Sequence, residues 1–128
     1  MMNFRVTETP MVDVLLKRFE KPDEIRTFER GKYEVVSIGQ VTVGRATYQP
    51  GWKWSLHVGP LTGASWCEVE HVGLVLSGHS KGLMRDGREF DLRAGDFFYV
   101  APGHDSWVVG NEPYVSLHFH GVERYAKK

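Results

Sequence analysis

The stretch that decides the fold of this chain is Glu68-Val69-Glu70-His71-Val72-Gly73-Leu74-Val75-Leu76-Ser77-Gly78. A second stretch of similar character follows further along the chain: Gly95-Asp96-Phe97-Phe98-Tyr99-Val100-Ala101-Pro102-Gly103-His104. Each is a run of strand-forming residues broken by glycine. Each also carries one histidine at a place where the interior of a β-barrel can use it. His71 and His104 are therefore the first candidates for chemistry.

The composition sets limits on the class of protein. A chain of 128 residues fits one domain with a real core, and its 16 basic and 16 acidic residues balance. This balance argues against a nucleic-acid or acidic-membrane partner, because such partners normally require a basic patch. The single cysteine, Cys67, excludes an internal disulfide and fits a reducing compartment. With no secretory signal pattern and no apolar stretch of membrane-spanning length, we expect a cytoplasmic protein.

Short β-rich runs joined by Gly and Pro continue outward from the two stretches. Residues 33–38 and 41–48 flank the pair Gly39-Gln40 and are typical of a hairpin, and Asp86-Gly87 is a favoured hairpin turn. The last run covers residues 114–120. This pattern predicts an all-β sandwich or barrel with a core over about residues 33–120. Because no repeat or linker divides the chain, we expect a single domain, 1–128.

The remaining segments are less regular. Residues 1–32 read as an N-terminal arm whose apolar run, 11–16, could be an edge strand or a helical turn, and residues 24–28 as one capped helical turn. Tryptophan alternates with polar residues over 52–58, which favours a strand, and a loop is expected over 61–65. The strand that contains His71 is expected to begin at about Trp66. We expect the charged tail, 123–128, to be solvated.

Three segments in this order carry a resemblance to a known family. They run from Glu70 to Gly78, from Met84 to Phe90 and from Ala94 to His104. Together they resemble the conserved barrel of the cupin superfamily, over about residues 47–119. The segment 50–58 further resembles small single-domain bacterial cupins. The resemblance implies a cupin-type double-stranded β-helix, or jelly-roll, barrel with an N-terminal arm.

Metal-binding cupins usually carry two histidines separated by one residue and a glutamate on the first motif, with a further histidine on the second. Aligned on that pattern, His71 takes the glutamate position, Cys67 the second-histidine position and Ser65 the first, whereas His104 is retained. Strand alternation independently places Cys67 and His71 on one face. The resulting hypothesis is a metal held by His71 and His104, with His57 as third ligand and Cys67 as fourth ligand or close neighbour.

The residue types narrow the choice of metal. Imidazole suits zinc, iron, nickel and copper, and a thiolate favours zinc or copper(I). Loss of the carboxylate weakens the case for manganese, so we expect a divalent transition metal, with zinc or iron ahead of manganese. Three nitrogen ligands would leave a position for substrate.

Each candidate also has a purely structural interpretation. His71 and His104 could be buried, hydrogen-bonded core residues, His57 could anchor a loop, and Cys67 could simply pack. The last strand places His118 and His120 on one face, from which one could reach the interior. We expect both to be exposed or interfacial, so they stay outside the site. The four tryptophans could line a ligand pocket, pack the core or form a dimer contact; they are Trp52, Trp54, Trp66 and Trp107.

Three functions stay open. The first is a metal-dependent cupin acting on a small molecule, by dioxygenase, isomerase or lyase chemistry, among which the fold does not select. The second is a metal-free, non-catalytic cupin that binds or senses a small ligand, and the third is a structural dimer without a working site. Whether the chain is an enzyme is therefore undecided. We expect a homodimer, because the arm before Asp23 could exchange between barrels as an edge strand.

Overall fold

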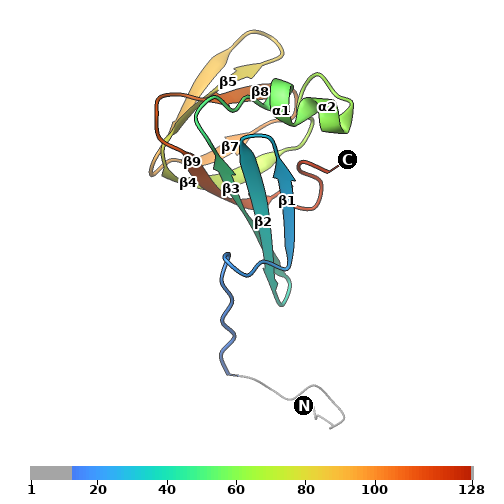
Figure 1. Cartoon of the computed structure of the whole chain (residues 1–128), viewed down its shortest axis with the longest axis vertical. Helices are drawn as coiled ribbons and strands as arrows, with labels where there is room; N and C mark the ends of the chain where they lie inside the picture. The colour runs from blue at the N-terminus through green and yellow to red at the C-terminus, as the bar shows by residue number, and fades with distance from the viewer. Residues whose placement is uncertain (1–12, 128) are drawn as a thin grey trace.

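A computed structural model describes residues 13–127 of the chain, and the first twelve residues of the expected arm lie outside this range. The architecture is two antiparallel sheets, with strand orders β1-β2-β3-β9-β4-β7 and β6-β5-β8 (Figure 1). The strands are β1 (Glu24–Phe28), β2 (Gly31–Ile38), β3 (Val41–Tyr48), β4 (His71–Ser77), β5 (His79–Met84), β6 (Glu89–Arg93), β7 (Phe97–Val100), β8 (His104–Val108) and β9 (Tyr114–His120). The predicted all-β barrel fold is confirmed.

Glycine allows the central strands of the larger sheet to approach closely. A Cβ atom added at Gly73 of β4 would lie 2.3 Å from the carbonyl oxygen of Leu117 on β9 and 2.7 Å from the ring of Phe98 on β7. Such contacts are far below van der Waals distance, so only glycine fits between these two neighbours. The close approach of β7 and β9 therefore explains why β4 has a glycine two residues after His71.

The segment 24–28 is a strand, so the expected helical turn is wrong. All five residues of β1 pair with β2, which places the start of the sheet inside the expected arm. The capping signal, Asp23, is used differently: its carboxylate accepts a hydrogen bond from the backbone N–H of Ser37 at 2.8 Å and one from Lys17. A single helical turn fixes many dihedral angles for one hydrogen bond, whereas pairing with β2 satisfies the whole segment.

The segment 52–58 forms no strand. The chain instead makes two short helices, α1 (Trp54–His57) and α2 (Gly59–Thr62), the second where a loop was expected. Pro60 stands at the beginning of α2, where its missing N–H costs nothing, and Gly63 ends it with a positive φ of 76°. Over so few residues the spacing of Trp52 and Trp54 is compatible with either structure, and both side chains are buried.

The core is rich in aromatic side chains. Tyr48 stacks on Trp52 with ring centroids 3.7 Å apart and planes 2° apart, and Tyr114 stacks on the other side of Tyr48 at 5.8 Å. All three rings belong to the buried core of the domain. Among residues 13–127 no helix has both the length and the apolar character needed to cross a bilayer.

Candidate metal centre

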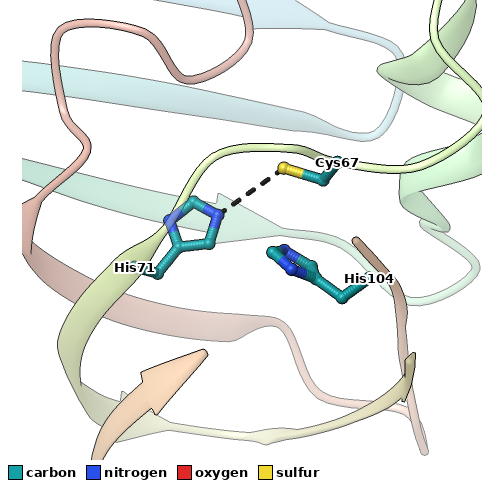
Figure 2. A group of neighbouring side chains, drawn as sticks. All are labelled: Cys67, His71 and His104. Atoms are coloured by element: carbon teal, nitrogen blue, oxygen red, sulfur yellow. Dashed lines mark hydrogen bonds between the residues drawn. The ribbon is translucent and has the colours of Figure 1, made fainter. Parts of the chain in front are cut away.

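Three metal-ligating side chains meet inside the barrel: Cys67, His71 and His104 (Figure 2). Each offers one ligand atom, and these atoms all lie within 4.8 Å of one another. The Sγ atom of Cys67 lies 3.7 Å from Nε2 of His71. All three side chains are buried. Strand alternation predicted that Cys67 and His71 point the same way, and Figure 2 shows the sulfur of Cys67 directed at the ring of His71, with the ring of His104 nearby.

Backbone pairing holds the two motifs in register. His71 is the first residue of β4 and lies opposite Val100 of β7. The strand begins five residues later than the sequence suggests, so Cys67 lies before β4. Its backbone instead pairs with the second stretch, which ends at His104. Its N–H donates to the carbonyl oxygen of His104 at 2.8 Å, and its own carbonyl accepts from the N–H of Gly103 at 2.8 Å. The Pro-Gly-His turn thus places the thiol beside His104.

A backbone contact selects the tautomer of His104. Its Nδ1 lies 2.7 Å from the carbonyl oxygen of Ala101. Because a carbonyl can only accept, Nδ1 carries the proton and donates. In the neutral ring Nε2 then has a free lone pair, which is the form that a metal requires.

Burial keeps the group uncharged. The pKa of His71 lies well below its ordinary value, first because of desolvation and then because of His118 and His104 nearby. Desolvation also lowers the pKa of His104 and raises that of the Cys67 thiol to about 12. At neutral pH the side chains are therefore two neutral imidazoles and a protonated thiol. The imidazoles can accept a cation directly, but the thiol must first lose its proton.

The distances fit a tetrahedral ion with little movement. Zinc bonds of roughly 2.0 Å to nitrogen and 2.3 Å to sulfur put the two ligand atoms about 3.6 Å apart at the tetrahedral angle. The observed Sγ–Nε2 separation in the Cys67–His71 pair is 3.7 Å. The other separations, up to 4.8 Å, would have to shorten by about 1.5 Å at most, which side-chain rotation can supply. Two imidazoles and a thiol therefore fit a borderline metal such as zinc or iron(II), and the described group has no carboxylate for a harder ion.

The structure does not bring His57 into this group, so the expected third ligand is misplaced. His57 lies on α1, where its Nδ1 accepts a hydrogen bond from the backbone N–H of Lys53 at 3.0 Å. Its Nε2 lies 3.9 Å from a carboxylate oxygen of Glu29. Both ring nitrogens thus face local partners, and the loop-anchor interpretation describes this residue.

Two residues that were expected at the surface lie beside the candidate ligands. His118 is buried, with its ring centroid 5.1 Å from that of His71 and its Nε2 2.9 Å from Oγ of Ser116. Tyr125, from the tail expected to be solvated, is also buried, 5.2 Å from His71 by ring centroids. The sequence did carry a signal for His118, because it lies at the same alternate positions of β9 as the buried residues Tyr114 and Ser116. No local pattern signals Tyr125.

His120 shares the strand of His118 but ends outside, as expected. The pairing of β4 with β9 shifts in register between Val72 and Gly73, so the strand bulges between the two histidines. His120 then lies at the surface, where its Nε2 bonds to Glu70 at 2.8 Å. The bulge separates two residues that simple alternation would place on one face.

A cavity of about 40 Å³ adjoins the group. It lies between the two sheets, and its walls are mainly aromatic. The lining residues are Tyr48, Trp52, Trp54, His71, Ser80, Phe90, Leu92, Phe98, Val100, His104, Ser106, Tyr114, His118 and Tyr125. Four of them carry a buried ring nitrogen without a hydrogen-bond partner among the described residues: Trp52, Trp54, His71 and His118. Space for only a few atoms, with polar groups in the wall, suits a small polar ligand.

Comparison with known proteins gives a relationship by structure alone. No family model matches the sequence, and no curated protein matches it. Among solved structures, the oxalate decarboxylase of Lactobacillus farciminis, in a formate complex, matches with a TM-score of 0.57 and 21% identity. That match covers 77% of this chain and 30% of the enzyme.

The oxalate decarboxylase of Bacillus subtilis is similar to the same degree. One of its structures matches with a TM-score of 0.57 and 26% identity over 77% of this chain and 28% of the enzyme. Another, of an enzyme with Mn(II) centres, matches with a TM-score of 0.54 and 24% identity over 76% of this chain and 27% of the enzyme. This chain thus spans less than a third of the length of these enzymes.

Proposed function

This chain has the cupin fold, as the oxalate decarboxylases do, and from that premise we propose that it is a metal-dependent cupin acting on a small organic acid. The observation that carries the proposal is the buried group Cys67, His71 and His104, whose ligand atoms lie within 4.8 Å of one another. Two of these positions, His71 and Cys67, differ in residue type from the usual cupin ligands but stand at ligand positions.

The chemistry of the donors supports zinc or iron over manganese. Manganese prefers carboxylate, carbonyl and water oxygens, whereas the group here consists of a thiol and two imidazoles. When bound, such a metal supplies a Lewis acid that polarises a carboxylate or carbonyl oxygen. The aromatic wall, with Trp52 and Trp54, excludes bulk water from the place where that oxygen would lie.

The size of the cavity supports a small substrate. Space of about 40 Å³ admits a few non-hydrogen atoms, so a short carboxylic acid is a better fit than a nucleotide or a sugar. The neighbouring enzymes are named for a two-carbon dicarboxylate, which agrees with this size class. Of the reactions considered from sequence, lyase chemistry on such an acid is the one we propose.

The decisive experiment measures the metal content of protein purified without an affinity tag. We expect near-stoichiometric zinc or iron in the wild type and a loss of at least tenfold in the double variant His71→Ala/His104→Ala, because a single remaining thiol cannot hold the ion. The matched control is His79→Ala/His120→Ala, which removes two histidines outside the described group and should retain the metal.

A wild type that stays metal-free after incubation with zinc and with iron(II) would sink the proposal. Equal metal content in the two double variants would also contradict it, because the ion would then be bound elsewhere. If metal is bound as expected, the loaded protein is the one to screen against short carboxylic acids.

We also propose that the chain forms a homodimer through the outer face of its larger sheet. Four apolar side chains are exposed on the adjacent strands β4, β7 and β9: Leu76 (46% exposed), Phe97 (73%), Tyr99 (60%) and Phe119 (45%). The rings of Phe97 and Phe119 lie 6.4 Å apart, so at least these two side chains form one apolar surface. An exposed apolar surface of this kind is typical of an interface, and the partner we propose is a second copy of the same chain.

Charge placed on this face should prevent the association. We expect Phe97→Glu/Phe119→Glu to elute as a monomer in size-exclusion chromatography with light scattering, whereas the wild type elutes as a dimer. The control is Leu56→Glu on α1, which replaces an exposed apolar residue of similar size outside the patch. A wild type that is monomeric at a concentration of about 100 micromolar would contradict the proposal, and so would a variant that stays dimeric.

A further inference from the structure

We propose that the turn formed by residues 121–127 is a removable stopper, and that a small organic anion reaches His71 and His104 in the inner cavity by displacing it. The identity of the ligand rests on the proposed function, whereas the stopper itself rests on the packing of this turn alone. Neither sheet contains the turn, and it follows directly on β9. In Figure 1 this last segment curls back beside β1.

The turn enters the barrel instead of following its surface. Gly121 starts it with a φ of 82°, at a place where an added Cβ would lie 2.2 Å from the carbonyl oxygen of Glu70. The chain can bend this sharply and this close to Glu70 only at glycine. The bend turns Val122 and Tyr125 inward, and both are buried to 2% exposure or less.

Tyr125 occupies space next to the candidate ligands. Its hydroxyl oxygen accepts a hydrogen bond from the hydroxyl of Tyr48 at 2.6 Å. Its ring centroid lies 5.2 Å from that of His71 and 6.2 Å from that of His118. The phenol therefore forms part of the wall of the 40 Å³ cavity, and its removal would enlarge the cavity toward the outside.

One side chain fastens the turn to the barrel. Nη1 of Arg26 on β1 donates to the carbonyl oxygens of Val122 and Tyr125, at 2.7 and 2.6 Å. The backbone–backbone hydrogen bonds of the turn are internal, from the N–H groups of Arg124 and Tyr125 to the carbonyl of Gly121. Because no sheet pairing holds this segment, it can open without disrupting a strand.

The turn stands between two spaces. The inner one is the 40 Å³ cavity, to which Tyr125 contributes. The outer one, of about 170 Å³, is lined by Trp54, Thr62, Ala64, Trp66, Cys67, Glu68, Val69, Arg124, Ala126 and Lys127. Trp54 borders both, and the turn supplies residues to both walls. Cys67 already borders the outer pocket, and displacing the turn would join that pocket to the inner cavity, which His71 and His104 line.

Charge at the outer pocket selects an anion. The turn places the cationic side chains of Arg124 and Lys127 there. The one acidic side chain in the lining, Glu68, is paired with Arg85. The remaining positive charge would attract a carboxylate and disfavour a cationic ligand.

The test uses the metal-free protein and follows alkylation of Cys67, the one cysteine in the sequence. The probes are iodoacetamide, which is neutral, and iodoacetate, which is a two-carbon carboxylate. We expect slow labelling of the wild type and an increase of about tenfold or more in Arg26→Ala and in Tyr125→Ala, because each removes a contact that keeps the turn closed. The control is Arg30→Ala, which deletes an arginine from the same hairpin that instead contacts the carbonyl oxygen of Pro50.

The preference for an anion is tested by comparing the labelling rates of iodoacetate and iodoacetamide. The ratio of iodoacetate to iodoacetamide rates should exceed that of a free thiol in the wild type and should fall severalfold in Arg124→Ala/Lys127→Ala. An unchanged ratio would overturn the assignment of an anionic ligand. Equal labelling rates in wild type, Arg26→Ala and Tyr125→Ala would overturn the stopper.

Hydrogen exchange on the wild type tests whether the turn opens independently of the rest of the domain, even if a variant fails to fold. A stopper requires that the amides of Arg124 and Tyr125 exchange at least a hundredfold faster than those of Ser116 and His118 on β9. Equal rates would mean that the turn opens only when the whole domain unfolds, which excludes the proposal. All these measurements are made without metal, so the stopper and the metal site can fail independently.

Discussion

Lowering the pH from 7 to 4 should destabilise the metal-free protein by roughly 3 kcal/mol through His118 alone. Burial holds the pKa of His118 at about 4, against an ordinary value of 6.5. Between pH 6.5 and 4, His118 is protonated in the unfolded chain but neutral in the folded chain, so lowering the pH favours unfolding. The stabilisation is complete above about pH 6.5 and is lost as the pH falls toward 4. His71 and His104, whose pKa values are also lowered, add to the loss.

The measurement is the free energy of unfolding by urea at pH 7, 5.5 and 4 in the presence of a chelator. Several carboxylates also have lowered pKa values and contribute in acid, Asp23 and Glu24 among them. The comparison is therefore between wild type and His118→Gln, which keeps a polar side chain that does not titrate. We expect the variant to show a shallower decline than the wild type. Parallel curves for wild type and His118→Gln would contradict a buried neutral His118.

Zinc affinity should rise about tenfold per pH unit between pH 7 and 9, or about a hundredfold over that range, if Cys67 is a ligand. The pKa of the thiol is raised to about 12, so the free protein holds this proton throughout the range. A metal bound to the thiolate must release it, and each pH unit makes that release ten times more favourable. His71 and His104 have lowered pKa values and are already neutral at pH 7, so they add no such dependence.

Competition with a chelator of known pH dependence gives the dissociation constant at each pH. We expect Cys67→Ser to bind more weakly and with a nearly flat dependence on pH, because two neutral imidazoles release no proton. A flat profile in the wild type would show that Cys67 is a neighbour and not a ligand. The metal would then be held by histidines alone, and a further donor would have to be sought near His118.

The sequence was a good guide wherever the relevant pattern is local. Short apolar runs joined by glycine and proline predicted an all-β sandwich or barrel, the resemblance of three segments to cupins implied the barrel, and the structure confirms it. Alternation along the chain placed Cys67 and His71 on one face, and the structure brings both to His104. Both inferences started from a few neighbouring residues, although Cys67 itself lies before β4 and is held in place by backbone bonds to Gly103 and His104.

The sequence failed where a long-range contact outweighs a local preference. Residues 24–28 carry a capping signal, yet they form a strand because β2 offers partners for all of their backbone groups. His57 was expected at the centre but folds back on Lys53, because residues 54–57 form a helical turn. Short segments with mixed signals are decided by what they pack against.

By itself the sequence determined the all-β class and several turns, because strand periodicity and glycine conformations act over a few residues, and its resemblance to cupins implied the barrel. Only the tertiary structure decided that His118 is buried while His120 is exposed, since a register shift between β4 and β9 separates them. It alone decided that Tyr125 is buried beside His71, where its carbonyl oxygen accepts a hydrogen bond from Arg26, 99 residues earlier. Such contacts join distant segments, and no local pattern encodes which of them meet.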